Sequence, residues 1–581
     1  MQSKYNKEPI IAVKGQDHNV CSGYQGIAKQ LMSQLNGTKK SVIVIECYPT
    51  VREEEIIQGL LPFINPVSVI RVASAALPVS KVNSMVERFM TNDRVFGYMT
   101  PYNIQECYDS EGLSALRMQV DSITEGTVIV IGFGAALVTE GDLLVYADLT
   151  RWEIQLRYRS KEYGNWQADN QEEDILRKYK RGYFFEWRMA DRHKRSLFDR
   201  IDYYLDTNTK DDPKMVAWES LLEGMAQTAN QPFRLVPYFD PGVWGGQWLE
   251  KHIDLPPREN PYAWGFDGVP EENSLYMQFG KIRVEVPAIN LVFLQPQALL
   301  GEKVYARFGA EFPIRFDFLD TVGGQNLSLQ VHPTTDYIRE NFGMTYTQDE
   351  SYYILDAKPG AHVYMGVKEG VDRGKMLEDL EKAQQGDIAF PAEEYINIFP
   401  AEKHDHFLIP AGTIHCSGSD CMVLEISATP YIFTFKLWDW DRLGLDGKPR
   451  PVHLEHGSKV IQWDRTTSWV EKELVGRVEE IAVGDGWREE RTGLHEYEFI
   501  ETRRHWFSEP VLHQANGSVH VLNLVEGNEA VVESPDHAFD PFVIRYAETF
   551  IIPASIERYV IRPTESSSGE TLATIKAYVK S

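Results

Sequence analysis

Cysteine is scarce in this sequence, and so are long apolar runs. The 581 residues include five cysteines, an odd number that is widely scattered and contains no CxxC pair. This usage excludes a disulfide framework and favours a reducing compartment, so we expect a cytoplasmic protein. No uninterrupted apolar run approaches the ~20 residues of a membrane span. The first nine residues contain no apolar stretch of the kind found in a secretory signal.

Positive charge is also in short supply. The chain has 59 Lys and Arg residues against 85 Asp and Glu residues, and its net charge is −26. Because sequence-independent binding to nucleic acid or anionic lipid relies on Lys and Arg, we expect neither a nucleic-acid partner nor a membrane partner. Hydrophobic residues make up 43% of the chain and charged residues 25%, which is a globular composition. The length predicts three or four domains at roughly 150 residues each.

Short Val/Ile-rich runs alternate with helical segments over the first ~210 residues. Such continuous apolar runs are typical of a parallel sheet covered on both faces, so the pattern predicts an α/β domain. A helix is expected from about residue 26 to residue 35. The predicted strands are residues 10–13, 42–46, 67–72, 127–132 and 143–147.

The pattern changes after residues 207–214, TNTKDDPK, which we interpret as a linker. From about residue 231 onward, short apolar segments are separated by Gly, Pro and Asp turns, which is typical of an all-β unit. Residues 368–385 form one helical segment within it.

The loop after the first predicted strand has the outline of a phosphate-binding loop. Residues 15–26 read GQDHNVCSGYQG. In such loops backbone N–H groups and a helix N-terminus hold the phosphates, a Lys reaches the terminal phosphate, and a Ser or Thr holds magnesium. Tyr24 and Gln25 stand at the Lys and hydroxyl positions. We therefore do not expect nucleotide binding.

The amino-terminal region resembles the small-molecule kinases of the uridine kinase type. VIVIGFGAAL (128–137) followed by DLLVYADLTRWEIQLRYR (142–159) is similar to their later strands and arginine-rich lid. The resemblance implies a degenerate P-loop domain over residues 1–212, with an active kinase and an unrelated α/β domain as alternatives. We interpret the basic stretch 177–200 as a solvated helix face. Binding of a phosphorylated regulator is the other interpretation of that stretch.

Four polar residues in the middle of the chain are candidate ligands of a metal ion. In LSLQVHP (327–333), strand alternation places Gln330 and His332 on one face, about 6–7 Å apart along the strand. Glu350 begins an apolar strand, and a Pro-Ala-Gly turn leads to His415. Two imidazoles, a carboxylate and an amide form a mixed N/O set that suits zinc and leaves room for water or substrate.

These residues lie in stretches that resemble the type I mannose-6-phosphate isomerases, which are zinc-dependent cupins. The stretches are VWGGQWL (243–249), FPIRFDFLDT (312–321), LSLQVHP, ESYYILDAKPG (350–360), FLIPAGTIH (407–415) and LWDWDRLGLDGKPRPVH (437–453). Residues 519–532 and 543–561 look like the family's second, metal-free cupin unit. The resemblance implies an all-β double cupin (jelly-roll) region. A catalytic domain would occupy residues 225–457 and a metal-free domain residues 458–581.

The resemblance also implies a reaction and a ligand set. One Zn²⁺ per chain would be held by Gln330, His332, Glu350 and His415, with Arg442 as the active-site arginine. The implied reaction interconverts mannose 6-phosphate and fructose 6-phosphate through an enediol(ate).

An acidic protein needs a local basic cluster to attract an anionic substrate. The available residues are Lys436, Arg442, Lys448 and Arg450. A plain polar turn is the alternative interpretation of residues 448–450.

One position departs from the family pattern. Gln348 stands where the family usually has a lysine, two residues before the glutamate ligand. Lys436 can take over that role, substrate preference can differ, or catalysis can be weak. The chain could then be a sugar-phosphate sensor with little or no catalysis, or an isomerase for a different sugar phosphate. A bifunctional kinase–isomerase is a further hypothesis, which Tyr24 and Gln25 oppose. The sequence does not give the oligomeric state.

Overall fold

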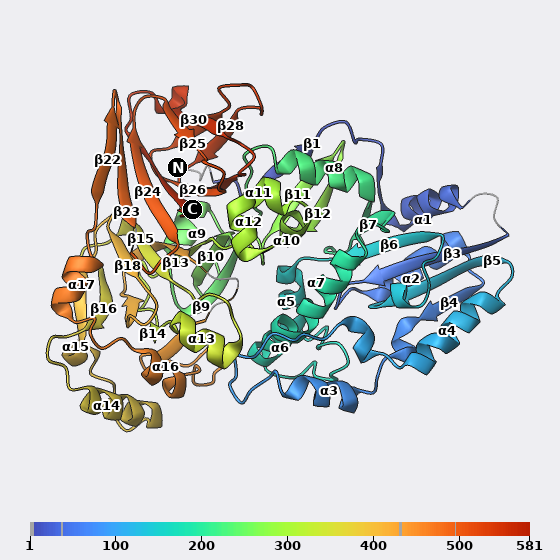
Figure 1. Cartoon of the computed structure of the whole chain (residues 1–581), viewed down its shortest axis with the longest axis horizontal. Coiled ribbons are helices and arrows are strands. Elements are labelled where there is room, and N and C mark those ends of the chain that lie inside the picture. The colour runs from blue at the N-terminus through green and yellow to red at the C-terminus, as the bar shows by residue number, and fades with distance from the viewer. Residues whose placement is uncertain (1–4, 36–38, 429–430, 432, 494, 581) are drawn as a thin grey trace. The chain divides into compact units, whose positions relative to one another are not determined.

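A computed structural model describes residues 5–35, 39–428, 431, 433–493 and 495–580 (Figure 1). The chain divides into two compact units, each assembled from separate segments. Ile10–Gln227 and Ser274–Leu294 form the first, here called the α/β unit. Met1–Pro9, Thr228–Asn273 and Gln295–Ser581 form the second, here called the β unit. None of the described helices is long and apolar enough to cross a membrane.

A seven-stranded sheet forms the centre of the α/β unit. Its five strands from β7 to β4 run parallel, as the Val/Ile runs predict, and β8 and β2 add antiparallel pairs at one edge. In spatial order the strands are β2 (Val20–Ser22), β8 (Lys214–Ala217), β7 (Tyr203–Asp206), β6 (Leu143–Asp148), β3 (Lys40–Cys47), β5 (Gly126–Gly132) and β4 (Ser68–Arg71).

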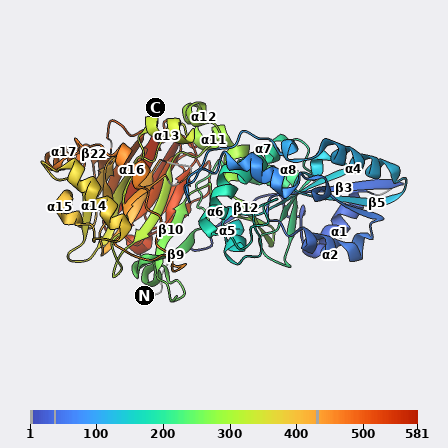
Figure 2. The same ribbon diagram turned by 90° about the horizontal axis from the view of Figure 1, so that it is seen from below.

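Helices cover both faces of this sheet. In Figure 2, α4 lies on one side of β3 and β5, and α1 and α2 lie on the other. The helices of the α/β unit are α1 (Gly23–Gln34), α2 (Glu53–Ile64), α3 (Val79–Glu87), α4 (Ser110–Ser122), α5 (Arg151–Arg159), α6 (Ile175–Arg181), α7 (Trp187–Ser196), α8 (Trp218–Thr228) and α10 (Ile289–Leu294).

The first predicted strand is present, but its predicted place in the parallel sheet is wrong. β1 (Ile10–Val13) pairs with β11 (Ser274–Phe279), which pairs with β12 (Ile282–Pro287) in a separate three-stranded sheet. The helix α1 follows the short edge strand β2. Residues 15–26 therefore do not connect a central parallel strand to a helix, which is the geometry a phosphate-binding loop requires.

Two further predictions for this region are wrong. Residues 207–214 join β7 to β8, which are antiparallel neighbours in one sheet, so the stretch is a tight connection within a domain. The basic stretch 177–200 is not a solvated helix face, because Lys178, Lys180 and Lys194 are all buried. Lys194 binds Asp148 at 2.7 Å, and Lys178 donates to the backbone oxygens of Tyr158 and Gln171. Buried acceptors therefore compensate the charges that the sequence pattern assigned to solvent.

The β unit contains two pairs of antiparallel sheets. The first pair, here called the first sandwich, has six and five strands. One sheet consists of β18 (His406–Ile409), β15 (Glu350–Ala357), β20 (Cys421–Ser427), β13 (Arg315–Asp320), β10 (Tyr262–Gly268) and β9 (Tyr238–Gly246). The other consists of β17 (Ile396–Pro400), β16 (His362–Val367), β19 (His415–Ser417), β14 (Leu329–Val331) and β21 (Phe435–Trp438).

The second sandwich follows the first along the chain. Its six-stranded sheet consists of β22 (Glu479–Gly484), β23 (Trp487–Gly493), β24 (Ile500–Phe507), β31 (Leu572–Val579), β26 (His520–Glu526) and β29 (Thr549–Ile552). Its four-stranded sheet consists of β25 (Val511–Gln514), β30 (Arg558–Pro563), β27 (Glu529–Glu533) and β28 (Phe542–Arg545). Buried side chains from both sheets share one apolar core, which includes Phe507, Leu522, Val532 and Ile561.

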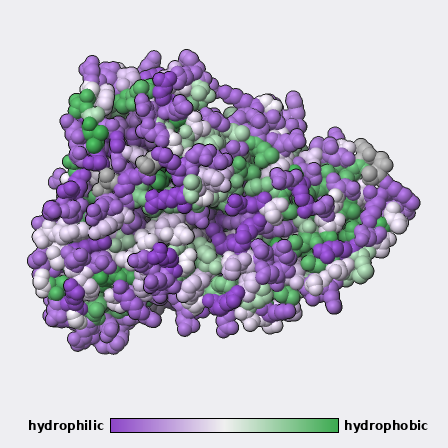
Figure 3. Space-filling view, viewed as in Figure 1, coloured by the Kyte–Doolittle hydropathy of each residue, from purple (hydrophilic) through white to green (hydrophobic). Residues whose placement is uncertain are grey.

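Short helices join the strands of the β unit. The predicted helical segment is present as α14 (Arg373–Gln385), but the prediction that it stands alone is wrong. The others are α9 (Trp248–Ile253), α11 (Pro296–Leu300), α12 (Glu302–Phe308), α13 (Thr335–Phe342), α15 (Ala392–Tyr395), α16 (Leu454–Val460) and α17 (Thr467–Glu473). The face of the molecule in Figure 3 is mostly hydrophilic, with hydrophobic residues in small groups, as the composition leads one to expect.

Candidate metal centre

Three of the predicted ligands meet inside the first sandwich. His332 directly follows β14, Glu350 begins β15 of the opposite sheet, and His415 begins β19. The Oε1 atom of Glu350 lies 3.1 Å from Nε2 of His332 and 2.7 Å from Nε2 of His415. All three side chains are buried. Among the described residues, this is the group of His, Cys, Asp and Glu side chains whose geometry suits a metal ion.

The hydrogen bond at Nδ1 of each imidazole determines whether Nε2 carries a proton or a lone pair. Nδ1 of His332 lies 2.9 Å from the Phe433 carbonyl oxygen, and Nδ1 of His415 lies 2.9 Å from that of Thr413. A carbonyl can only accept, so each Nδ1 carries a proton. In the neutral rings, both Nε2 lone pairs then point toward a carboxylate oxygen. With both rings neutral, three acceptors converge on one point, and positive charge between them, from protons or from a metal ion, would relieve their repulsion.

The acid–base properties of the group agree with this requirement. Burial opposes the charged form of Glu350, but the nearby His332 and His415 outweigh it and hold the Glu350 pKa well below its usual range. Burial likewise opposes a charged His332, and Glu350 outweighs it, so the His332 pKa is raised. Protons on the imidazoles are thus one way to supply the missing positive charge, and a divalent cation is the other.

Gln330 lies beside this group. In the sheet register it pairs with His415 on one side and with Lys436 on the other, so the three side chains share one face. Its amide nitrogen Nε2 lies 3.2 Å from Nε2 of His415. Because the amide oxygen and nitrogen of a Gln can exchange places by a simple flip, the oxygen is equally able to face the group. Gln330 is therefore positioned to act as a fourth, neutral ligand.

A second layer of acids lies behind Glu350, and the sequence analysis missed it. Gln348 donates from Nε2 to Glu350 Oε2 at 3.0 Å and to Glu425 Oε1 at 3.4 Å. Burial, followed by repulsion from Asp317 and Glu350, raises the Glu425 pKa well above its usual range. Burial also raises the Asp317 pKa to about 6. A lone acid within each apolar run, FDF for Asp317 and VLEI for Glu425, was the available signal.

Two of the four residues of the predicted basic cluster share one carboxylate partner. Arg442 and Arg450 both bind Asp439 Oδ1, at 2.8 and 2.9 Å. Asp439 also accepts from the Ser328 hydroxyl at 2.6 Å, two residues before Gln330 in the chain. Lys448 lies in an exposed turn and Lys436 in β21. One buried carboxylate thus holds two guanidiniums next to the start of β14 and offsets part of their charge.

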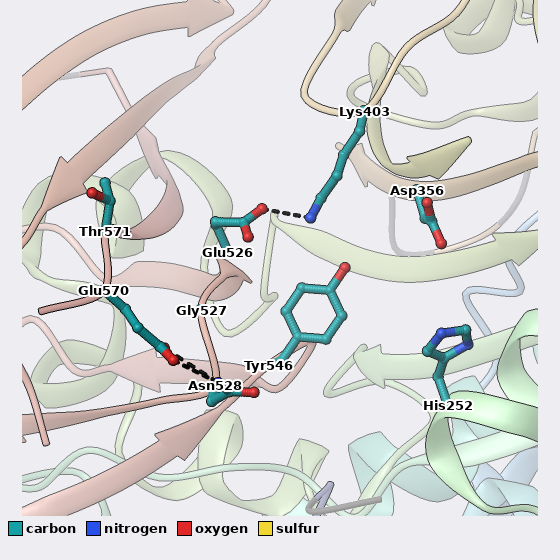
Figure 4. A pocket seen from close by; sticks show the side chains of 9 residues that line it. All are labelled: His252, Asp356, Lys403, Glu526, Gly527, Asn528, Tyr546, Glu570 and Thr571. Atoms are coloured by element: carbon teal, nitrogen blue, oxygen red, sulfur yellow. Dashed lines mark hydrogen bonds and ion pairs between the residues drawn. The ribbon is translucent and has the colours of Figure 1, made fainter. Parts of the chain in front are cut away.

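A separate pocket of about 570 Å³ contains none of the predicted site residues (Figure 4). Asp356, which lines it, lies at the opposite end of β15 from Glu350. Lys403 forms an ion pair with Glu526 at 2.5 Å across one side of the pocket, and Tyr546 stands beside them. The pocket and the candidate metal centre are therefore different places in the β unit.

Comparison with known proteins gives different results for the two halves of the chain. A family model described as "Domain of unknown function (DUF8485)" matches residues 23–230. The mannose-6-phosphate isomerase ManA of Bacillus subtilis is 25% identical over 240 residues, which cover 40% of this chain and 68% of the relative. The mannose-6-phosphate isomerase of Streptococcus mutans is 26% identical over 233 residues, again 40% of this chain and 68% of the relative.

Solved structures of mannose 6-phosphate isomerases also match this chain. The crystal structure of the Bacillus subtilis mannose 6-phosphate isomerase matches with a TM-score of 0.48 at 18% identity, covering 60% of this chain and 99% of that one. The sequence matches show that about two fifths of this chain is homologous to mannose-6-phosphate isomerases.

Proposed function

We propose that this protein is a zinc-dependent aldose–ketose isomerase that interconverts mannose 6-phosphate and fructose 6-phosphate. The observation that carries the proposal is the convergence of His332, Glu350 and His415 as three buried acceptors around one point. Homology to proteins named mannose-6-phosphate isomerases supports the substrate class.

The donor set fits a zinc ion. Two imidazole nitrogens and a carboxylate oxygen, with the Gln330 amide beside them, are the ligand types that zinc accepts in catalytic sites. When bound, the cation polarises the substrate oxygens as a Lewis acid. The backbone carbonyls of Phe433 and Thr413 orient the two imidazoles for this task.

The remaining chemistry falls to residues of this chain. The isomerisation moves the C2 proton to C1 and the O2 hydroxyl proton to O1 through an enediol(ate), so no atom is gained or lost. We propose that Arg442 stabilises the negative charge that develops on the substrate oxygen. Gln348 can be neither a cation nor a proton donor of useful acidity. Lys436, which shares a face with Gln330 and His415, takes that role. Arg450 and Lys448 then bind the phosphate group of the substrate.

The neutral side chain of Gln348 favours a second candidate function. Gln348 has no charge and no useful acidity, and its amide spans two carboxyl groups. A protein with this arrangement can hold a metal and a sugar phosphate without turning the sugar over. It would then act as a sugar-phosphate sensor. A sugar phosphate other than a hexose 6-phosphate would be the third possibility for the same site.

Turnover and binding measured on one sample separate these functions. Zinc-loaded protein is given mannose 6-phosphate, and fructose 6-phosphate is followed through a coupled dehydrogenase, while calorimetry records binding. Turnover that a chelator abolishes and zinc restores supports the isomerase, and His415→Ala should abolish it. The exposed His537→Ala serves as the matched control. Binding without turnover selects the sensor. If neither is detected with any aldose or ketose phosphate, the proposal fails.

A further inference from the structure

The second sandwich contains a polar cavity of its own, here called the second-sandwich cavity. It has a volume of about 550 Å³, which is within the usual range for small-molecule sites. Most of its lining comes from β24, β25 and β31 and from the turn between β25 and β26. Its polar lining includes Arg503, His505, His513, His520, Lys576 and Tyr578.

The sheet register shows that this lining faces the interior of the sandwich. Arg503 pairs with Lys576, so their side chains share one face of the six-stranded sheet. Lys576 also pairs with Leu522, which belongs to the apolar core between the two sheets. The same interior is therefore filled by apolar side chains at one place and by charged and imidazole side chains at another.

Two imidazole nitrogens in this cavity have no hydrogen-bond partner among the residues that the structure describes. They are Nδ1 of His505 and Nε2 of His513, and both residues are no more than 3% exposed. The two rings lie 4.4 Å apart, centroid to centroid. Nε2 of His505 lies 3.1 Å from Glu489 and donates to it, so Nδ1 of the neutral ring is an acceptor. Buried polar atoms without partners are uncommon and mark places where a ligand can bind.

Lys576 is the second notable feature of the cavity lining. Its side chain is almost fully buried, and Glu489 Oε1 lies 3.8 Å from its ammonium nitrogen. The same Glu489 oxygen lies 3.1 Å from Arg503 and 3.1 Å from His505, so it serves three partners. Burial lowers the Lys576 pKa to about 8, which reflects this incomplete compensation. With Arg503 and Lys580, the cavity has three cations against Glu489 and Glu501 in a chain of net charge −26.

We propose that the second-sandwich cavity binds a small hydroxylated oxyanion, a phosphate or carboxylate attached to a hydroxyl-bearing carbon chain. Lys576 and Arg503 face the oxyanion, and the His505 Nδ1 lone pair accepts from a hydroxyl group. A metal ion suits this cavity less well, because among the described residues the converging three-ligand group lies in the first sandwich. The proposal stands independently of the isomerase function.

Calorimetry on the full-length, zinc-loaded protein tests this, with glycerol 3-phosphate as the phosphate probe and glycerate as the carboxylate probe. Neither probe is an aldose or ketose, so the first sandwich cannot turn it over. Lys576→Met keeps the side chain's length and removes its charge. It should lower the affinity for the preferred probe by about tenfold or more. Lys576→Arg should retain binding. Lys403→Met makes the same change in the pocket of Figure 4 and should leave the affinity unchanged.

The probes and variants together decide the outcome. Preference for glycerol 3-phosphate identifies a phosphate ligand, and preference for glycerate a carboxylate ligand. Thermal unfolding of Lys576→Met and retention of binding in Lys576→Arg guard against a folding defect. Binding that survives Lys576→Met unchanged, or that Lys403→Met or His415→Ala abolishes, would place the ligand elsewhere and overturn the proposal. Absence of binding by both probes to the unaltered protein would overturn it as well.

Discussion

Gln348 connects the candidate metal ligands to the acids behind them. Its amide donates to both Glu350 and Glu425, and its carbonyl oxygen accepts from the Phe433 backbone N–H at 3.0 Å. A neutral amide therefore stands where Asp317, Glu350 and Glu425 place several carboxyl groups close together. At the scale of the residue, position 348 therefore adds hydrogen bonds to these carboxyl groups but no positive charge.

If the missing lysine at position 348 limits catalysis, as in the second candidate function, replacing this amide with a cation should raise isomerase activity. In Gln348→Lys the ammonium group can form ion pairs with Glu350 and Glu425 and supply a proton donor, so we expect a higher kcat with mannose 6-phosphate. Gln348→Met, which removes the hydrogen bonds and adds no charge, should not raise it. The coupled assay measures both variants under zinc saturation. An unchanged or lower kcat in Gln348→Lys would show that the missing lysine does not limit this protein.

Arg234 connects several elements of the β unit through buried ion pairs. It lies 3.2 Å from Asp267 of β10 and 2.8 Å from Glu548, which precedes β29. It also donates to the backbone oxygens of Asn6 and Thr549. The elements that Arg234 joins come from the start, the middle and the end of the sequence. Its removal would leave two buried carboxylates without their partner.

Arg234→Met should therefore destabilise the β unit strongly. We expect a loss of about 3–5 kcal/mol in the free energy of unfolding, because breaking one side of a buried pair leaves uncompensated charge. Arg339→Met, which breaks the exposed pair with Asp336, should cost less than about 1 kcal/mol. Denaturant unfolding followed by tryptophan fluorescence compares the two. Equal losses in both variants would contradict the role assigned to Arg234.

The contact between β7 and β12 should make the α/β unit sensitive to pH. Burial, and then repulsion from Asp206, raises the Glu285 pKa from 4.5 to about 7. Between these two values the folded protein holds a proton that the unfolded chain releases. Stability from this group is therefore present below pH 4.5 and is lost as the pH rises to about 7.

Glu285→Gln should remove this part of the pH dependence. The pKa shift sets an upper limit of about 3 kcal/mol. Because the side chain is partly exposed, we expect the variant to gain roughly 1–2 kcal/mol on the wild type between pH 4.5 and pH 8. Denaturant unfolding at both pH values measures the gain. The exposed Glu140→Gln is the control, and an equal gain there would contradict the assignment to Glu285.

Across the whole molecule, the sequence was most informative where local patterns decide the structure. Strand alternation in LSLQVHP and the Pro-Ala-Gly turn placed Gln330, His332 and His415 correctly with respect to their strands. The Val/Ile runs likewise identified β3, β5 and β6. These features depend on neighbours within a few residues, which a sequence shows directly.

Features that depend on distant partners could not be predicted in the same way. The partner of β1 is β11, more than 260 residues away, and no local pattern names it. The local sequence around Lys194 predicts exposure, yet Asp148 compensates its charge and Asn290 accepts a hydrogen bond from it inside the fold. Glu425 lies in β20 and Asp317 in β13, and their closeness follows from strand pairing alone. Pairing between distant segments decides these cases.

The central claim is that His332, Glu350 and His415 hold one metal ion, and metal content tests it most directly. Protein loaded with zinc and dialysed exhaustively is analysed by mass spectrometry for metals, together with Glu350→Gln and Glu425→Gln. We expect about one zinc per chain in the wild type and in Glu425→Gln, and much less in Glu350→Gln, which loses the charged ligand. Wild-type protein that retains no zinc, or Glu350→Gln that retains as much as the wild type, would contradict the account.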